Sequence, residues 1–442
     1  GESLKAKGYE VIYSIPASAL RTHADPPPDI VKYAFTPPDA AAIINQVDPD
    51  CVVFCHWPVL AGVGESIPVP VVLDLAGPHV LERLFMQPDC LEQSAVEKIG
   101  ALSRADCFIC AGAVQKAYFT PWLMAAGVDV TRTPLHVAPI CMPPDQPVAR
   151  PSTEPRIAFS GIFLPWQDPG DLLEALVNEI EAHECARLEF FGGPHPIHPV
   201  PAGAFATLLE RIRGSDRVVF HGIAPFDDLV KTISTCTAAF DVMLPNIERE
   251  IAFNVRTVMY MWCGVPVIYN NYAELARHIA EYEAGWLVNP ADQSALRKVL
   301  RDLLTSPDEA ARRGSNAQRL VRERFSWDTA MAPLHRFMQH PMLRDGHSAS
   351  QQVGFFELRM LEFLAEHRYY TRKPVENSVE SPRYSDAETR AELKRLERKV
   401  AQCESELSQT RQHARNLEEF RDRVMATSPY KFYRVMKRYL GR

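Results

Sequence analysis

The feature that most constrains the fold of this chain is a repeated alternation of short apolar runs with stretches of helical periodicity. In the first third of the sequence the apolar runs predict buried strands. They are Tyr9–Ser14, Cys51–Cys55, Val69–Leu75 and Ala105–Ala111. Asp39–Gln46 and most of Leu81–Leu102 have a helical pattern. Strands joined by helices of this length predict βαβ units and a parallel sheet.

A second series of the same kind follows a proline-rich stretch. Pro139–Pro155 contains six prolines, which remove backbone donors and predict a connector between domains. The strands expected beyond it are Arg156–Ser160, Arg187–Phe191, Arg217–His221, Ala238–Met243, Pro266–Tyr269 and Gly285–Val288. We therefore predict two successive α/β domains, 1–145 and 156–345. Because Ser3–Gly8 resembles the end of a helix, we expect the first strand of the first domain to be missing from this sequence.

The composition changes beyond residue 345. Residues 346–390 predict a helix and a loose linker, and residues 391–425 carry an apolar heptad that predicts a parallel coiled-coil homodimer. A solitary helix packed on its own domain is the alternative. Residues 428–442 combine an apolar aromatic face with a basic rim, which is typical of a helix lying on an anionic membrane. Docking of that helix back onto the protein is the alternative.

Length and composition narrow the class of protein. A chain of 442 residues exceeds what one core supports, and no run approaches the ~20 apolar residues of a membrane-spanning helix. A net charge of −7 argues against general nucleic-acid binding. The ten scattered cysteines indicate reduced thiols and a cytoplasmic compartment, with the Cys107–Cys110 pair buried rather than metal-binding.

Glycines follow three consecutive strands of the second series. Gly161 follows Ile157–Ser160, Gly192 and Gly193 follow Leu188–Phe191, and Gly222 comes just after the third. Ligands of parallel sheets bind at the carboxyl ends of strands, where glycine lets the backbone approach a phosphate. Such glycines also serve ordinary turns, but three in a row favour a nucleotide site.

Several segments resemble one enzyme family. Phe253–Ile268 with Glu274-Leu275, Ser160–Pro169 and Phe325–Asp328 resemble the donor domain of retaining glycosyltransferases of the family 4, group 1 type, which have the two-domain GT-B fold. Val71–Glu82 and Cys110–Gln115 resemble a subgroup from bacterial O-antigen and capsule clusters. The resemblance implies transfer of a sugar from a nucleoside-diphosphate sugar to a glycan or lipid-linked acceptor. It implies no cofactor and no metal, and a cytoplasmic enzyme at the inner face of the plasma membrane.

The chain departs from that family at the donor site. The usual ribose-binding Glu is Met259, and the usual diphosphate-binding Arg and Lys are Ile162 and Gln167. We therefore expect Arg256 to be the main diphosphate contact, because guanidinium offers a fork to phosphate oxygens. A surface charge or a structural salt bridge is the alternative role. The expected donor-binding residues are Gly161, Gln167, Gly192, Gly193, Glu250, Asn254 and Arg256. Helix N-termini above Gly161 and near Asn254 are expected to present backbone N–H groups to the diphosphate.

Asp74 and His79 are the catalytic candidates on the acceptor side. Both lie at the end of an inner strand of the first series, where we expect Asp74 to accept a hydroxyl proton and His79 to orient the sugar or acceptor. A hydrogen-bonded structural histidine is the alternative. Two other functions stay open for the whole chain: a catalytically degenerate paralogue that acts as a coiled-coil scaffold, and a nucleotide-sugar 2-epimerase.

Overall fold

The computed structural model describes residues 1–20, 28–36, 39–63, 67–133, 135–182, 186–195, 200–201 and 205–344. The chain divides into two compact units, Gly1–Arg368 and Tyr369–Arg442, and all described residues belong to the first. The expected linker over 346–390, the coiled coil over 391–425 and the basic helix over 428–442 lie outside the described residues, so they stay predictions. Within the described part, no helix is both long and apolar enough to cross a membrane.

The first sheet has four parallel strands in sequence order, β1-β2-β3-β4. The strands are β1 (Val52–Cys55), β2 (Val71–Asp74), β3 (Cys107–Cys110) and β4 (Leu135–Val137). β4 was missed because three residues give little pattern. The strand predicted at Tyr9–Ser14 is wrong: that run has no assigned strand, and Ile12 is 41% exposed. Only a single parallel bridge, Pro16 to Phe35, forms nearby.

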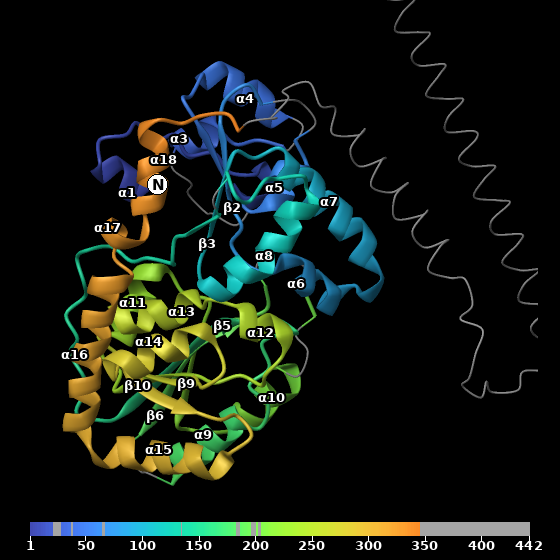
Figure 1. The fold of residues 1–442 in the computed structure, drawn as a ribbon. Coiled ribbons are helices and arrows are strands. Elements are labelled where there is room, and N and C mark those ends of the chain that lie inside the picture. The colour runs from blue at the N-terminus through green and yellow to red at the C-terminus, as the bar shows by residue number, and fades with distance from the viewer. Residues whose placement is uncertain are drawn as a thin grey trace, which may run out of the picture. The chain divides into compact units, whose positions relative to one another are not determined.

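Helices surround this first sheet (Figure 1). They are α1 (Glu2–Ala6), α2 (Ala17–Leu20), α3 (Pro28–Lys32), α4 (Ala40–Val47), α5 (Trp57–Ala61), α6 (His79–Met86), α7 (Leu91–Ser103) and α8 (Ala113–Ala125). The helix expected over Leu81–Leu102 is split between α6 and α7 by a 3-10 turn at Pro88–Cys90. Pro88 explains the break, because it has no backbone N–H to continue α6.

The second sheet has six parallel strands in the order β10-β9-β8-β5-β6-β7. All six predicted strands are present: β5 (Arg156–Ile162), β6 (Arg187–Gly193), β7 (Val218–Gly222), β8 (Ala238–Asp241), β9 (Val267–Asn270) and β10 (Gly285–Val288). Numbered within this domain the order is 3-2-1-4-5-6, that of a doubly wound dinucleotide-binding fold. The direction of winding reverses between β5 and β8, which is where ligands of such sheets bind.

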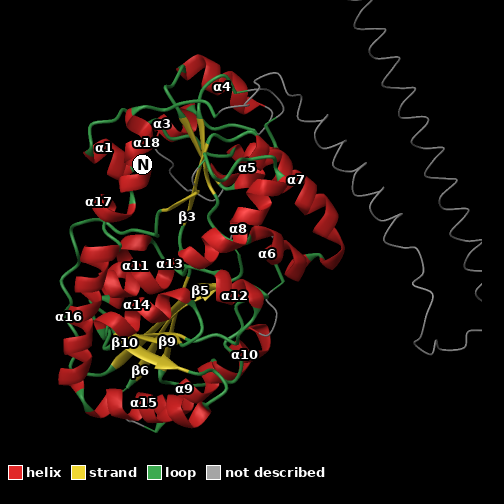
Figure 2. Ribbon diagram, viewed as in Figure 1, coloured by secondary structure: helices red, strands yellow, loops and turns green. Residues whose placement is uncertain are grey.

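Both faces of the second sheet are buried, which explains its continuously apolar strands. Ile157 and Phe159 face one core, whereas Ala158 between them faces the other. Figure 2 shows the helices above and below these strands. They are α9 (Leu172–Glu181), α10 (Phe205–Ile212), α11 (Phe226–Ile233), α12 (Ile247–Ile251), α13 (Val255–Trp262), α14 (Glu274–Tyr282), α15 (Gln293–Thr305) and α16 (Pro307–Arg324).

The end of the described chain returns to the first domain. After α17 (Trp327–Ala330), α18 (Ala332–Gln339) contributes Leu334 to a small core with Val72 and Cys107. Arg344 then donates its backbone N–H to Asp106 at 2.8 Å. The structure thus confirms two parallel α/β domains, and the boundaries expected at 145 and 156 stay predictions.

Candidate functional site

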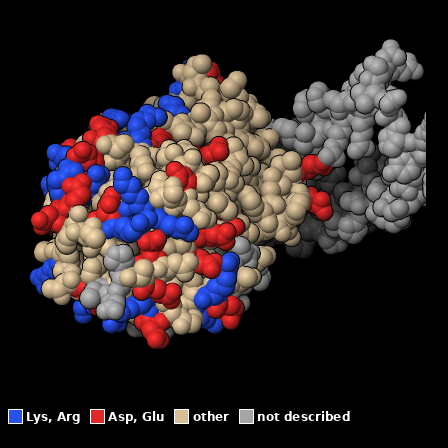
Figure 3. Space-filling view, turned by 90° about the horizontal axis from the view of Figure 1, so that it is seen from below, with Lys and Arg blue, Asp and Glu red and all other residues tan. Residues whose placement is uncertain are grey.

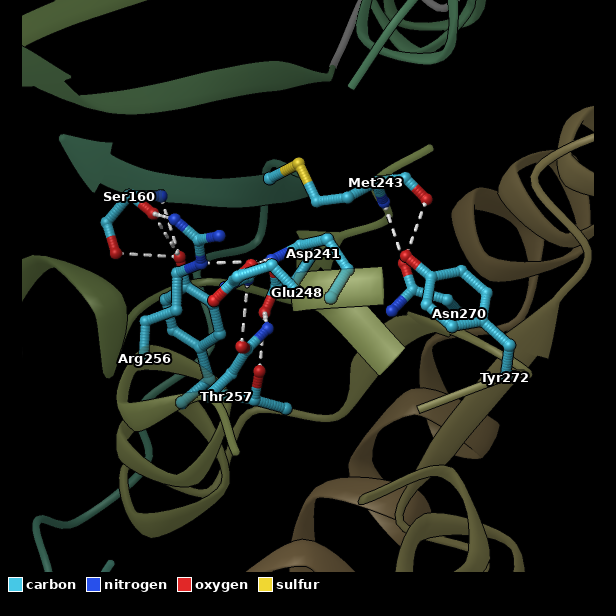
Figure 4. A network of polar contacts seen from close by, with 11 residues as sticks. Ser160, Asp241, Met243, Glu248, Arg256, Thr257, Asn270 and Tyr272 are labelled. Carbon is cyan, nitrogen blue, oxygen red and sulfur yellow. Dashed lines mark hydrogen bonds and ion pairs between the residues drawn. The ribbon is translucent and has the colours of Figure 1, made fainter. Parts of the chain in front are cut away.

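An arginine lies at the point where the second sheet reverses its winding. Arg256 Nε donates to Asp241 Oδ1 at 3.0 Å, and Arg256 Nη1 donates to the Ser160 carbonyl at 3.1 Å (Figure 4). Ser160 belongs to β5 and Asp241 ends β8, so the guanidinium joins the two strands at the switch point. Arg256 Nη2 is buried and has no hydrogen-bond partner among the described residues. The side chain is therefore held in place while part of its donor capacity stays unused.

Glycine is required beside this arginine. A Cβ on Gly161 would lie 2.3 Å from Arg256 Nη1, and one on Gly192 would lie 2.3 Å from the Gly161 carbonyl oxygen. The two glycines are direct neighbours in the β5–β6 register. Of the glycines predicted from sequence, Gly161 thus lies against the guanidinium and Gly192 lies against Gly161.

Asp241 is the centre of the network and was missed by the sequence analysis. Its side chain is fully buried, and Oδ2 accepts from Asn254 Nδ2 at 3.0 Å and from the Thr257 hydroxyl. Burying a carboxylate requires such partners. The signal in the sequence was an aspartate at the carboxyl end of a buried apolar strand.

A second buried ion pair lies next to the first. Glu248 and Arg249 form two bonds, Nε to Oε2 at 2.5 Å and Nη2 to Oε1 at 2.7 Å. Arg249 Nη1 also donates to Asn254 Oδ1 at 3.0 Å, which joins the pair to the Asp241 cluster. Burial raises the pKa of Glu248, and Arg249 offsets part of that rise.

The remaining predicted donor residues, Glu250, Gln167 and Gly193, form no hydrogen bond or ion pair with the network around Asp241 and Arg256 in the described part of the chain. Glu250 is exposed, and its neighbour Glu248 occupies the network instead. Gln167 lies in the loop after β5, where its backbone N–H donates to the Leu164 carbonyl. Gly193 is the last residue of β6, and a Cβ there would be 3.6 Å from Ile223.

The two expected helix N-termini differ in outcome. Asn254 is the N-cap residue of α13, as expected, although its side chain bonds to Asp241 and Arg249 rather than to the helix. The helix expected directly above Gly161 is absent there, because β5 continues to Ile162 and α9 begins only at Leu172. Helix α13 thus begins at the cluster, and the first turn of a helix presents backbone N–H groups that have no partner within the helix.

Asp74 ends β2 in the first domain. Its Oδ1 accepts the backbone N–H of Ala76 at 3.0 Å, and burial raises the pKa of the carboxyl group. Ala76 has a φ of 50°, a left-handed conformation that is uncommon outside glycine. A raised pKa makes the carboxylate a stronger base towards a hydroxyl proton.

His79 is the first residue of α6 and has partners on both ring nitrogens. Nδ1 lies 3.0 Å from Glu82 Oε2, and Arg83 Nε donates to Nε2 at 3.3 Å. Arg83 in turn bonds Glu97 at 2.7 Å. His79 and Asp74 thus lie at the carboxyl edge of the first sheet, but no direct bond joins them among the described contacts.

His56 is the functional candidate that sequence reasoning missed in this domain. It follows β1 directly, and its ring centroid lies 4.5 Å from that of His79. Its φ is 90°, and its Nδ1 is buried without a partner. Burial lowers the pKa of His56 to about 4. The signal in the sequence was a histidine directly after the apolar run Cys51–Cys55. Asp74 was selected because it lies at the corresponding end of the next strand.

The two domains contact each other beside these sites. Glu274, the first residue of α14, accepts the backbone N–H groups of Ala113 at 2.7 Å and Val114 at 3.0 Å. Phe85 on α6 packs against Trp166 with ring centroids 6.2 Å apart. The negative charge of Glu82 also adds to the pKa rise that burial produces at Glu248. Helix α6, which carries His79 and Glu82, thus contacts α12, which carries Glu248.

Two further predictions concern cysteines and surface charge. Cys107 and Cys110 are buried, and burial raises the pKa of each thiol to about 12, so they remain protonated core residues. On the face shown in Figure 3, basic and acidic side chains are interspersed rather than gathered in one basic field.

Comparison of sequences finds relatives for the second domain. Residues 154–306 match the family model described as glycosyl transferases group 1. The chain is 26% identical over 182 residues to an MMP alpha-(1->4)-mannosyltransferase of Mycolicibacterium hassiacum, covering 40% of each chain. It is 27% identical over 176 residues to a D-inositol 3-phosphate glycosyltransferase of Streptomyces avermitilis, covering 39% of this chain and 37% of that relative. The chain therefore spans about two fifths of the length of these curated relatives.

Comparison of structures extends the similarity to both domains. Sucrose-phosphate synthase of Thermosynechococcus elongatus superimposes with a TM-score of 0.58 at 18% identity, over 77% of this chain and 90% of that chain. WaaG, a glycosyltransferase involved in lipopolysaccharide biosynthesis, gives 0.51 at 14% identity, over 74% and 93%. HepE of Anabaena, in complex with UDP-glucose, gives 0.50 at 14% identity, over 69% and 84%. Residues 154–306 therefore resemble the group 1 glycosyltransferase family, and the two-domain architecture that contains them is that of the GT-B fold.

Proposed function

We propose that the protein is a glycosyltransferase that moves a sugar from a nucleoside-diphosphate sugar to a glycan or lipid-linked glycan acceptor. The observation that carries this is the fixed guanidinium of Arg256, with an unpartnered Nη2, at the switch point of a doubly wound sheet. The structural neighbour HepE was solved with UDP-glucose, which supports a nucleotide-sugar donor. WaaG supports a role in cell-surface polysaccharide synthesis. The retaining outcome follows from the family resemblance alone.

The donor side would act on the leaving diphosphate. Arg256 would take up the charge that develops on the phosphate oxygens, with α13 backbone N–H groups beside it. Asp241 and the Ser160 carbonyl hold the guanidinium in advance, so little reorganisation is needed when the bond to the sugar breaks. Gly161, Gly192 and Gly193 would let the backbone approach the phosphates. In this proposal the diphosphate is stabilised by these groups and needs no metal.

The acceptor side would supply the proton transfer. Asp74, whose pKa is raised by burial, would take the proton of the attacking hydroxyl as the new glycosidic bond forms. His79, held by Glu82 and Arg83, would orient the sugar or the acceptor. Both groups lie in the first domain, opposite the donor cluster.

Calorimetry with UDP, GDP and dTDP tests this proposal. A charge-assisted hydrogen bond contributes about 1.5–3 kcal/mol, so Arg256→Ala should weaken the preferred nucleotide by roughly ten- to hundredfold. Because that variant leaves Asp241 buried without its partner, Arg256→Lys should be measured alongside it, with thermal unfolding as a check on folding. Arg301→Ala removes an exposed arginine of α15 and is the control. Variants that fold and bind as tightly as the parent would refute the assignment.

One observation favours the alternative of a non-catalytic scaffold. The charges of the donor cluster are balanced internally, Arg256 by Asp241 and Arg249 by Glu248. A diphosphate would therefore meet a cluster of zero net charge, without the family's additional basic residues. If the parent protein binds none of the three nucleotides, the scaffold function is favoured and the transferase proposal fails.

The C-terminal residues would bring the enzyme to its acceptor. Residues 391–425 would join two copies, and residues 428–442 would bind the anionic inner face of the plasma membrane. Truncation after residue 385 should convert a dimer to a monomer in light scattering. Truncation at Ser428 should abolish flotation with anionic liposomes, whereas neutral liposomes should bind neither form. An unchanged mass would contradict the dimer, and equal flotation of both forms would contradict the membrane role.

A further inference from the structure

We propose that His56, His79 and Glu82 form a binding site for a divalent cation in the first domain. Each residue offers one ligand atom, and the three atoms lie within 4.8 Å of one another. Among the described residues this is the single cluster of His, Cys, Asp and Glu side chains with such spacing. The proposal concerns metal binding only, so it does not depend on the proposed transferase activity.

The backbone brings the three ligands together from two strand ends. His79 and Glu82 are one turn apart on α6, so their side chains share a face, with Nδ1 and Oε2 3.0 Å apart. Two ligand atoms that each lie about 2.0–2.1 Å from a tetrahedral Zn²⁺ are only slightly further apart than Nδ1 and Oε2 are here. His56 comes from the end of β1, and its backbone N–H donates to the Asp74 carbonyl at 2.9 Å. A cation would need to draw His56 in by a small side-chain movement.

Two features of His56 indicate a functional role in addition to packing. Its φ of 90° and ψ of 129° lie in a region that non-glycine residues rarely occupy, and such strain concentrates at functional sites. Its Nδ1 is buried with no hydrogen-bond partner, which is costly unless a ligand or a water completes it. A metal ion bound at Nδ1 would satisfy this nitrogen.

The donor set and the exposure of the cluster suit an open metal site. Two imidazoles and one carboxylate are the protein ligands of several catalytic zinc ions, which keep one position for water or substrate. The side chains of His79 and Glu82 are 23% and 20% exposed, so an ion could enter from solvent. Helix α6, which carries two of the three ligands, also contacts α12 of the second domain.

Arg83 competes with a cation for this site. It donates to His79 Nε2 at 3.3 Å, which places the ring proton on Nδ1, directed at Glu82. Metal binding at Nδ1 requires the proton to move to Nε2, and the bond from Arg83 is then lost. The tautomer changes and no proton is released. Arg83 would keep its bond to Glu97 and its contact with the Trp57 ring after it loses the hydrogen bond to His79.

Metal titration of the full-length protein tests the proposal. With Zn²⁺ in calorimetry we expect one site that is weakened at least tenfold in His56→Ala and in Glu82→Gln, and tightened in Arg83→Gln. His278→Ala is the matched control, because its Nδ1 is also buried without a partner but belongs to α14 in the second domain. Cys55→Ser controls for the exposed thiol at the end of β1.

Co²⁺ distinguishes this site from binding by thiols. Its visible spectrum should show tetrahedral or five-coordinate ligand-field bands without thiolate charge transfer, and His56→Ala should remove the bands. Zn²⁺ should also raise the melting temperature of the parent and of His278→Ala, but not that of His56→Ala. If the parent binds neither ion, or if the His56→Ala and Glu82→Gln variants, checked for folding by circular dichroism, bind as the parent does, the proposal is wrong.

Discussion

The position of Arg256 depends on the absence of a side chain at residue 161. The guanidinium is fixed by bonds to Asp241 and the Ser160 carbonyl, and its Nη1 occupies the space that a Cβ on Gly161 would take. A flexible side chain can move away from such a clash. Here the move would break bonds within a buried ion pair, so it would carry a cost.

We therefore predict that Gly161→Ala weakens nucleotide binding to nearly the same extent as Arg256→Ala. The added methyl group would displace Nη1, and with it the donor group aimed at the diphosphate. Calorimetry with the preferred nucleotide measures the effect. Gly214→Ala is the control, because no heavy atom lies within 4 Å of its expected Cβ. Unchanged affinity in Gly161→Ala would mean that Arg256 does not contact the nucleotide from its present position.

Sequence reasoning identified Arg256 and Gly161 but not the residues that hold them. Motif resemblance selected the arginine, since its helix carries the family pattern. Asp241 and Glu248 could not be selected in the same way, because their importance comes from burial and pairing across strands. Glu250 was chosen because the second Glu of the resembling family would fall near Ile251, whereas the short helix α12 turns Glu248 inward. His56 was missed because a single histidine after a strand has no periodic signal.

Helices α7 and α8 bury a lysine against three aromatic rings. Lys98 is fully buried, and its Nζ lies 4.0 Å from the Trp122 ring centroid and 4.7 Å from those of Tyr118 and Phe119. Its ammonium has no hydrogen-bond partner. Burial lowers the pKa of Lys98 to about 7, and contact with the ring faces opposes that shift.

Because of this lysine, the free energy of unfolding should vary with pH in the alkaline range. Between a folded pKa near 7 and an unfolded value of 10.5, the unfolded chain binds more protons, so the free energy of unfolding rises with pH across this window. The contribution is at most about 1.4 kcal/mol per pH unit. Urea unfolding at pH 7 to 9.5 should show a smaller rise in Lys98→Met than in the parent. Buried thiols and tyrosines titrate in both proteins. The difference between the pH profiles of the parent and of Lys98→Met therefore reports on Lys98 alone.

The exposed Lys231 of α11 provides the comparison. Lys231→Met should retain the parent's pH dependence. Parallel pH profiles for the parent and Lys98→Met would show that the ring faces keep Lys98 charged in the folded state, and would contradict the prediction.

Elements were predictable where pattern and burial agree. The six strands of the second sheet are buried on both faces, so their apolar runs are unambiguous. Tyr9–Ser14 has similar residues but no neighbouring strand to pair with, and tertiary context decides that outcome. The division between α6 and α7 was signalled by Pro88, whereas the three residues of β4 are too few to show a period.

For the whole molecule, one carboxylate joins the two domains at the start of a helix. Glu274 of the second domain accepts two backbone N–H groups of α8 in the first, where the helix dipole favours negative charge. Gly112 makes room for it, since a Cβ there would lie 2.2 Å from Glu274 Oε2. The contact between the two domains therefore includes two hydrogen bonds that a single substitution can remove.

We predict that Glu274→Ala exposes the first turn of α8. Hydrogen exchange of peptides that contain Ala113 and Val114 should become faster, because these amides lose their acceptor. Gly112→Ala should have a similar effect by displacing the carboxylate. The double variant should then be no faster than either single variant, since both remove the same contact. Glu281→Ala, which removes an exposed carboxylate of the same helix α14, should leave the exchange unchanged. Additive effects of the two substitutions would show that Gly112 and Glu274 act separately and that this contact does not join the domains in solution.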